Sequence, residues 1–228
     1  MLWKTAAAYT PNNISDENFE CAYIPNTQWP NRIWAKQPLS LQELEKTKQK
    51  LGPHYKNLIF SHFYTPNINE SLQKNQNFKP KSIQYGMSVS LNNKFNTQKN
   101  IVFKTVSNED EAQLWSEAFY STFGYEISAK TILSTKEHIP FYLIYFKQEL
   151  IGTIILFITN KTAGIHSLGV IPQKRKQGFA TEIMHHILNT AITKNLSFAT
   201  LQASQMAKDM YLKMGFSIDF LMENYQLK

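Results

Sequence analysis

Residues 166–181 read His166-Ser167-Leu168-Gly169-Val170-Ile171-Pro172-Gln173-Lys174-Arg175-Lys176-Gln177-Gly178-Phe179-Ala180-Thr181. The apolar beginning predicts a strand, and the basic loop that follows leads into a long segment with apolar residues at helical spacing. The first N–H groups of a helix lack intrahelical partners, and the helix dipole adds positive character there. Gly178 permits a close approach to the backbone, and three neighbouring cations add charge. The stretch therefore predicts a cradle for a pyrophosphate group.

The cradle differs from the common nucleotide-binding loops, since the sequence contains neither G-x-x-x-x-G-K-[ST] nor G-x-G-x-x-G. It contains R-x-x-G-x-A, with Arg175, Gly178 and Ala180 at the defined positions. A V-x-P strand end (Val170 to Pro172) precedes the loop, and a Y-x-x-x-G-F signature follows at 211–216. These motifs, in this order and spacing, resemble the acyl-CoA-binding domain of the GCN5-related N-acetyltransferases, the GNAT superfamily. The resemblance covers roughly residues 101–228.

The second half of the chain predicts a β-α-β-β-β-α-β-α-β order. The expected strands are 101–106, 141–146, 152–159, 164–170, 198–203 and 216–227, and the expected helices are 109–123, 179–194 and one between Ser204 and Gly215. The resemblance implies the GNAT fold for this part, a mixed, mostly antiparallel splayed sheet flanked by helices. The fold class is α/β.

The first half predicts a smaller α/β domain. Ser40 and Glu43 form a capping box that opens a helix running to Gly52-Pro53, and strands are expected near 58–63 and 85–91. The polar stretch 92–100 marks the boundary, which gives domains 1–97 and 98–228. Residues 70–78 parallel 209–216, so the first domain resembles a degenerate GNAT repeat, although chance similarity is a rival explanation.

The resemblance implies acetyl-CoA as the acyl donor, with no metal. Its pantetheine would pair with the backbone of the strand before the loop, and its pyrophosphate would lie on the loop and the first helical turn. The residues carried over for this binding are Leu168, Gly169, Val170, Arg175, Lys176, Gln177, Gly178, Phe179, Ala180, Thr181 and Ser204. At Ser204 the family often has an asparagine, so this sequence departs from the family pattern at that position.

The same resemblance implies that a primary amine attacks the thioester directly. A tyrosine at the position of Tyr211 would protonate the departing thiolate. Many members use a glutamate as base, but here no acidic residue lies between Lys161 and Glu182. His166 shares strand parity with Leu168 and Val170, so we expect it to act as base or water relay. A buried histidine bonded to backbone is an equally weighted alternative.

Aromatic residues between 114 and 125 fall where the family's first helices wall the acceptor site. Core packing explains most of these rings, while Tyr120 and Tyr125 are the candidate substrate-binding residues because each has a polar tip. Glu182, His185 and His186 lie opposite the apolar face of their helix. We expect a solvated face there rather than a metal site.

Composition narrows the class of protein. The chain has 228 residues, 43% hydrophobic and 13% aromatic, which indicates a globular fold. A single cysteine, Cys21, in a segment that predicts no regular structure, excludes an internal disulfide. No signal peptide or membrane segment is apparent, so we expect a cytoplasmic protein without membrane contact. The net charge of +7 falls mostly in residues 1–100 and comes mainly from lysine, which favours a solvated face over a nucleic-acid surface.

The sequence thus predicts an N-acetyltransferase acting on an amine of a small molecule or a protein. A non-catalytic acyl-CoA sensor is one alternative, motivated by the missing strand glutamate. A binding module that acts through the basic first half is another. The acceptor, the acyl chain length and the oligomeric state are left open.

Overall fold

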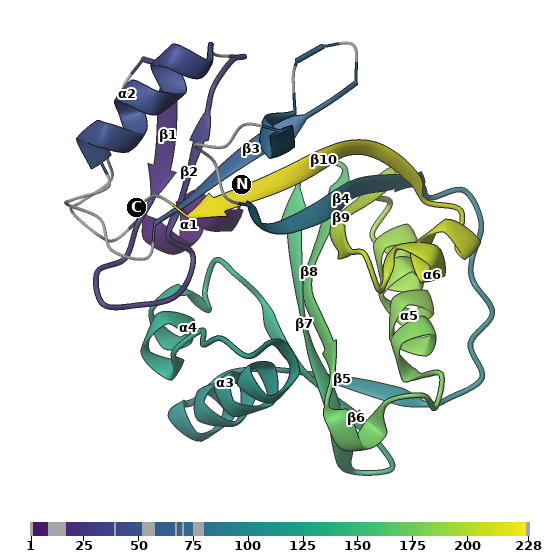
Figure 1. Cartoon of the computed structure of the whole chain (residues 1–228). Coiled ribbons are helices and arrows are strands. Elements are labelled where there is room, and N and C mark those ends of the chain that lie inside the picture. The colour runs from purple at the N-terminus through teal and green to yellow at the C-terminus, as the bar shows by residue number, and fades with distance from the viewer. Residues whose placement is uncertain are drawn as a thin grey trace. The chain divides into compact units, whose positions relative to one another are not determined.

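The structure is a computed structural model, which describes residues 2–8, 17–38, 40–51, 58–66, 68–69, 71–74 and 80–226 (Figure 1). The helices are α1 (Leu2–Ala7), α2 (Leu41–Leu51), α3 (Glu109–Phe123), α4 (Ala129–Thr135), α5 (Phe179–Thr193) and α6 (Lys208–Lys213), with 3-10 turns η1 (Leu72–Lys74) and η2 (Pro172–Lys174). The strands are β1 (Phe19–Ala22), β2 (Arg32–Ala35), β3 (Ile59–Tyr64), β4 (Pro80–Ser90), β5 (Ile101–Thr105), β6 (Phe141–Phe146), β7 (Glu149–Thr159), β8 (Thr162–Val170), β9 (Phe198–Ser204) and β10 (Ser217–Gln226).

Contacts group the chain into two compact units, which we describe separately. The central unit comprises residues 1–5 and 88–201, and the terminal unit comprises residues 6–87 and 202–228. Strands β4 and β9 each run from one unit into the other.

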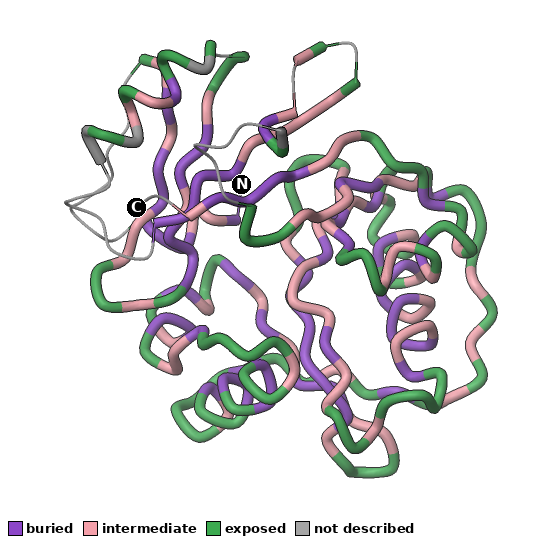
Figure 2. The backbone as a smooth tube through the Cα atoms, viewed as in Figure 1, coloured by how far each residue is buried: buried purple, intermediate pink, exposed green. Residues whose placement is uncertain are grey.

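In the central unit the strand order is β4-β9-β8-β7-β6-β5. The pairs β5–β6, β6–β7 and β7–β8 are antiparallel, and β8–β9 is parallel. Helices α3 and α4 lie on one side of β7 and β8, and α5 lies on the other (Figure 1). Figure 2 shows buried residues following β6, β7 and one side of α5, so the core of this unit lies between the sheet and its helices. This is the predicted mixed, mostly antiparallel sheet flanked by helices.

Local sequence signals explain the main elements of the central unit. The Asn108 side chain accepts a hydrogen bond from the Glu111 N–H at the start of α3, and Gly124 ends this helix at φ 73°. Lys147 and Gln148 both have positive φ and form the tight turn between β6 and β7. Helix α4 was not predicted; its signal is Ser128, whose hydroxyl accepts the N–H of Thr131.

The terminal unit has the strand order β1-β2-β3-β10-β4. Ser40 and Glu43 exchange the predicted capping-box hydrogen bonds at α2, with N···O distances of 2.8 and 3.3 Å. The core of the unit consists of Phe19, Cys21, Ile33, Leu44, Leu58, Phe60, Leu72 and Tyr225. The expectation that Cys21 lies in an irregular segment was wrong, because Cys21 is buried in β1.

The last strand of the chain belongs with the first half. Strand β10 pairs with β3 over six residues, from Leu221 opposite Tyr64 to Gln226 opposite Ile59. The contacts therefore divide the chain differently from the predicted domains 1–97 and 98–228, and the domain boundary stays a prediction.

The degenerate GNAT repeat in the first half also stays a prediction, because residues 70 and 75–78 of that repeat lie outside the described part. No helix in that part is long and apolar enough to cross a membrane.

Candidate active site

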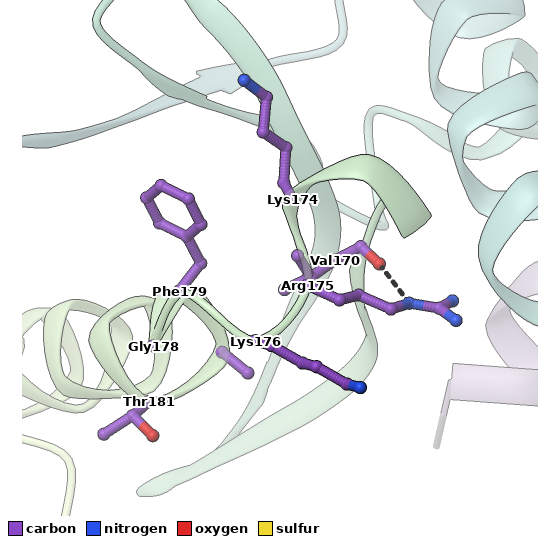
Figure 3. A pocket seen from close by; sticks show the side chains of 8 residues that line it. Val170, Lys174, Arg175, Lys176, Gly178, Phe179 and Thr181 are labelled. Carbon is purple, nitrogen blue, oxygen red and sulfur yellow. Dashed lines mark hydrogen bonds between the residues drawn. The ribbon is translucent and has the colours of Figure 1, made fainter.

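The loop after β8 and the first turn of α5 form an open pocket. Gly178 is the N-cap of α5, and it makes no side-chain capping bond. The first intrahelical bond runs from the Glu182 N–H to the Gly178 carbonyl, so the earlier N–H groups of the helix lack intrahelical acceptors. The pocket measures about 220 Å³. Figure 3 shows the side chains that line it. Its lining residues are Val170, Lys174, Arg175, Lys176, Gly178, Phe179, Ala180 and Thr181.

Gly178 lines this pocket with a backbone conformation that favours glycine. Its φ is +78°, which side chains rarely adopt, and a Cβ added there would meet no atom within 4 Å. That Cβ would therefore project into free space beside the N-terminus of α5. A residue with this backbone, at the head of a fifteen-residue helix, fits a bound phosphate group.

The basic residues of the loop have different partners. Arg175 donates from Nε to the Val170 carbonyl (3.1 Å, Figure 3) and from Nη2 to the Thr122 carbonyl (3.3 Å). Lys174 forms an ion pair with Glu149, whose carboxyl pKa it lowers. Arg175 thus holds the loop against the ends of β8 and α3, in addition to carrying charge. Gln177 is exposed and bonds to the Gln173 carbonyl.

Strand β8 contains a bulge that changes the predicted position of His166. Thr153 opposes Gly169 and Ile155 opposes His166, so two residues of β8, Ser167 and Leu168, face one residue of β7. Ser167 has φ +54°. Cross-strand partners project to the same face.

The bulge reverses the side-chain parity of β8. His166 and Gly169 share one face of β8, and Val170, opposite Gly152, is on the other. The expectation that His166 shares a face with Val170 was therefore wrong. A Cβ at Gly164 would lie 2.9 Å from His166 Nε2, so the imidazole packs over that glycine.

The face that carries His166 is the one covered by α3. A Cβ at Gly169 would lie 2.7 Å from Thr122 Cγ2 and 2.8 Å from the ring of Phe123. The Tyr125 ring packs on Phe119 and Phe123, and its residue is 37% exposed. Tyr120 is more exposed, at 57%. The end of α3 therefore presents partly exposed aromatic rings next to Gly169.

Strand β8 is fully paired only in its first half. It pairs with β9 from Thr162 opposite Phe198 to Ile165 opposite Leu201, and no further. Residues 166–170 keep their pairing with β7 alone. The part of β8 that contains Leu168, Gly169 and Val170 is therefore not paired with β9.

Two predicted site residues, Tyr211 and Ser204, belong to the terminal unit. Tyr211 lies on α6, is 6% exposed and packs edge-on against Phe216. Burial raises the pKa of its phenol to about 12. The Ser204 hydroxyl accepts the Ala207 N–H at 3.3 Å, so Ser204 shapes the turn before α6 and does not cap the helix directly.

The polar face of α5 is covered rather than solvated, which corrects the sequence-based expectation. The segment 92–100 lies beside α5 (Figure 1). Glu182 is buried and accepts the N–H groups of Gln98 (2.5 Å) and Lys99 (2.7 Å). His185 and His186 bond to the carbonyls of Asn96 and Lys99 at 2.8 Å. This polar stretch has no hydrophobic periodicity, so nothing in its sequence predicts the contacts with α5. No cluster of three or more His, Cys, Asp or Glu side chains suited to a metal occurs in the described ranges.

Burial raises the pKa of Glu182, but the backbone donors of Lys99 and Gln98 outweigh it, and the pKa is lowered overall. The carboxylate stays charged at neutral pH and fixes segment 92–100 against the first turns of α5.

Comparisons with known proteins agree with this geometry. Residues 105–216 match the sequence profile of the acetyltransferase (GNAT) family. A search of curated proteins gives no match.

Several solved structures share the fold. A GCN5-related N-acetyltransferase from Kribbella flavida is 14% identical, with a TM-score of 0.62 over 85% of this chain and 80% of that one. A conserved protein of unknown function from Staphylococcus epidermidis is 16% identical, with a TM-score of 0.65 over 94% and 92%. A GCN5-related N-acetyltransferase from Sphaerobacter thermophilus is 14% identical, with a TM-score of 0.63 over 85% and 71%. The match to the family profile and the shared fold lead to one conclusion: residues 105–216 of this chain are a domain of the GNAT acetyltransferase family.

Proposed function

We propose that this protein is an N-acetyltransferase that moves the acetyl group of acetyl-CoA directly to a primary amine. The observation that carries the proposal is the pocket at the N-terminus of α5, with Gly178 at positive φ beside open helical N–H groups. Family membership supports acetyl transfer, and the pocket supports a donor that carries phosphate. The proposed compartment is the cytoplasm.

The donor would bind along β8 and the loop. The open N–H groups at the start of α5, with Lys176 nearby, suit the pyrophosphate, while Arg175 holds the loop in shape. Gln177, Phe179, Ala180 and Thr181 complete the proposed binding stretch. The edge at Leu168, Gly169 and Val170 that does not pair with β9 suits the amide groups of the pantetheine arm, which would bind like an added strand. Arg175 already donates to the Val170 carbonyl, so the N–H groups are the main proposed partners there. Ser204 is the weakest of the proposed contacts, because its hydroxyl already accepts a backbone N–H.

The chemistry needs a base, an oxyanion donor and an acid. His166, on the α3 face of β8, would take a proton from the substrate ammonium. The neutral amine then attacks the thioester carbonyl, and a backbone N–H in 168–170 would stabilise the oxyanion. Collapse of the intermediate breaks the C–S bond, and the nitrogen releases its second proton to water, which leaves the neutral amide.

Tyr211 would donate a hydrogen bond, and then its proton, to the departing thiolate, and it would regain a proton from water. Its pKa of about 12 keeps the hydroxyl protonated before the reaction. Because the raised pKa makes full proton transfer less favourable, hydrogen bonding to the thiolate is its main proposed contribution.

The proposed acceptor site is the aromatic end of α3. Tyr120 and Tyr125 would contact the amine substrate through partly exposed rings with polar tips. Gly169 lies against Thr122 and Phe123, and the Tyr125 ring packs on Phe123. A ligand on the Tyr125 ring would therefore be close to the strand that carries the proposed oxyanion donors. This arrangement favours an amine with an apolar or aromatic substituent.

The test is calorimetric titration with acetyl-CoA, followed by a thiol-release assay across a panel of small-molecule and peptide amines. We expect binding that Gly178→Glu abolishes, and release of CoA with at least one amine. Failure of the wild type to bind acetyl-CoA would refute the proposal. Binding without release by any amine would favour the acyl-CoA sensor, for which the lack of a carboxylate on β8 is the motivating observation.

A further inference from the structure

The bulge in β8 is held by a side chain of the neighbouring strand. Thr153 of β7 is fully buried, and its hydroxyl donates a hydrogen bond of 3.2 Å to the Ser167 carbonyl. Ser167 is the bulge residue with φ +54°, a backbone conformation that a serine adopts at a cost. A bulge removes backbone groups from the regular ladder, and the part-buried carbonyl of Ser167 receives a donor from Thr153.

Gly152, the residue before Thr153, provides the space that the bulge needs. A Cβ at Gly152 would lie 2.0 Å from the Gly169 carbonyl oxygen, so only glycine fits at this point of β7. The dipeptide Gly152-Thr153 therefore accommodates the bulge in two ways. Gly152 lets the Gly169 carbonyl come close to β7, and Thr153 donates a hydrogen bond to the Ser167 carbonyl.

The geometry points to Thr153 as a positioning residue for acetyl transfer. It would act through the Ser167–Leu168 bulge, which sets the direction of the backbone N–H groups in 168–170. This inference rests on the proposed function, because those N–H groups are the proposed oxyanion and pantetheine donors. Thr153 would not touch the substrate itself. Its hydroxyl would fix the direction of the backbone N–H groups in 168–170, which would contact the substrate.

The chain offers a matched control. Thr135 on α4 is also buried, at 1% exposure, and its hydroxyl bonds to the Thr131 carbonyl of the same helix at 2.7 Å. Thr153→Val and Thr135→Val each remove one buried hydroxyl at nearly constant volume from the central unit. Thr153→Ser retains the hydroxyl and is the conservative rescue.

The experiment measures kcat and KM for acetyl-CoA in the full-length variants, together with the backbone amide NMR shifts of residues 166–170 in the free protein. For Thr153→Val we expect kcat to fall by roughly tenfold, less than the loss caused by deleting an oxyanion donor outright. KM should change much less, Thr153→Ser should restore kcat, and Thr135→Val should leave it unchanged. The amide shifts should move only in Thr153→Val.

Two results would overturn the inference. One is equal kcat for Thr153→Val and Thr135→Val in an active enzyme. The other is a set of 166–170 amide shifts in Thr153→Val that match the wild type. An inactive wild type would instead refute the proposed function, and the amide shifts would still test the hold of Thr153 on the bulge.

Discussion

Arg175 donates from Nε to the carbonyl oxygen of Val170, five residues earlier in the chain, at 3.1 Å. The same guanidinium reaches the Thr122 carbonyl near the end of α3. One side chain thus ties the loop to the strand before it and to a helix far away in sequence. A planar guanidinium has donors in several fixed directions, which an ammonium lacks.

Arg175→Lys should therefore weaken acetyl-CoA binding although the charge is kept. We expect about a tenfold loss of affinity, which corresponds to about 1.4 kcal/mol, because a lysine cannot keep both carbonyl contacts. Isothermal titration measures the effect.

Lys176→Met is the control, since it removes a charge from the same pocket without disturbing the carbonyl contacts of Arg175. If charge alone matters, Lys176→Met will weaken binding and Arg175→Lys will not, which would contradict the positional role of Arg175.

Gly178→Ala should abolish acetyl-CoA binding and destabilise the protein slightly. The φ of +78° makes any side chain costly by about 1 kcal/mol, and the new methyl group would enter the open pocket. Gly124→Ala is the matched control, because Gly124 has φ +73° and equally open surroundings at the end of α3. Chemical denaturation should show similar losses for both variants, and titration should show a loss of binding for Gly178→Ala alone. Retained binding in that variant would exclude the pocket as the phosphate site.

The sequence was sufficient to predict the elements whose signals are local. Capping residues marked α2 and α3, apolar spacing marked α5, and the loop motif marked the residues that line the pocket. The bulge at Ser167 was not predictable, since one extra residue shifts the alternation inside a nine-residue strand without a sequence motif of its own. It nevertheless moved His166 to the opposite face from Val170.

Long-range pairings were also beyond the sequence. Nothing in residues 217–226 indicates that β10 pairs with β3. In the sequence, the polar face of α5 looks like an ordinary solvated helix face, and only the structure shows that segment 92–100 covers it. In both cases the partner is remote in sequence, and backbone groups provide many of the contacts. Because every residue has these backbone groups, they leave no signal in the sequence.

Tyr211→Phe should lower kcat by about a hundredfold while acetyl-CoA still binds, because only the hydroxyl is lost. Because burial raises the pKa of Tyr211 to about 12, the protonated phenol persists throughout the usual assay range. The wild type should therefore show no fall in kcat between pH 8 and pH 10 due to this group. A pH profile of thiol release measures this, and an alkaline fall near pH 10 that disappears in Tyr211→Phe would contradict the burial of Tyr211.

Glu223 should make the terminal unit sensitive to acid. It is fully buried on β10, and burial by itself raises the pKa of its carboxyl group. Hydrogen bonds from Gln73, Ser71, Tyr225 and the Leu72 N–H outweigh this effect, so the pKa lies below its usual value. A lowered pKa gives stability that is present above the unfolded value and is lost as pH falls through the folded value. Glu223→Gln should reduce the free energy of unfolding by roughly 2 kcal/mol at pH 7, and by less at pH 3.

Urea denaturation at the two pH values measures this difference. Glu137→Gln is the control, since Glu137 is exposed and forms an ion pair with its neighbour Lys136, and surface pairs contribute little. An equal effect of Glu223→Gln at both pH values would show that the carboxylate charge is not what holds η1 to β10.

Residues 98–228 should not form a stable protein alone, although they contain the whole stretch that matches the family. Without residues 1–97, β10 loses its six-residue pairing with β3, and the buried side chains of Tyr225 and Glu223 lose the core around Phe60 and Leu72 and their hydrogen-bond donors. Circular dichroism and thermal melting of the 98–228 fragment should show no cooperative unfolding. Adding the separately produced fragment 1–97 should restore it, because β3 and β10 can pair between two chains as within one. A fragment 98–228 that unfolds cooperatively by itself would instead support the domain division predicted from the sequence.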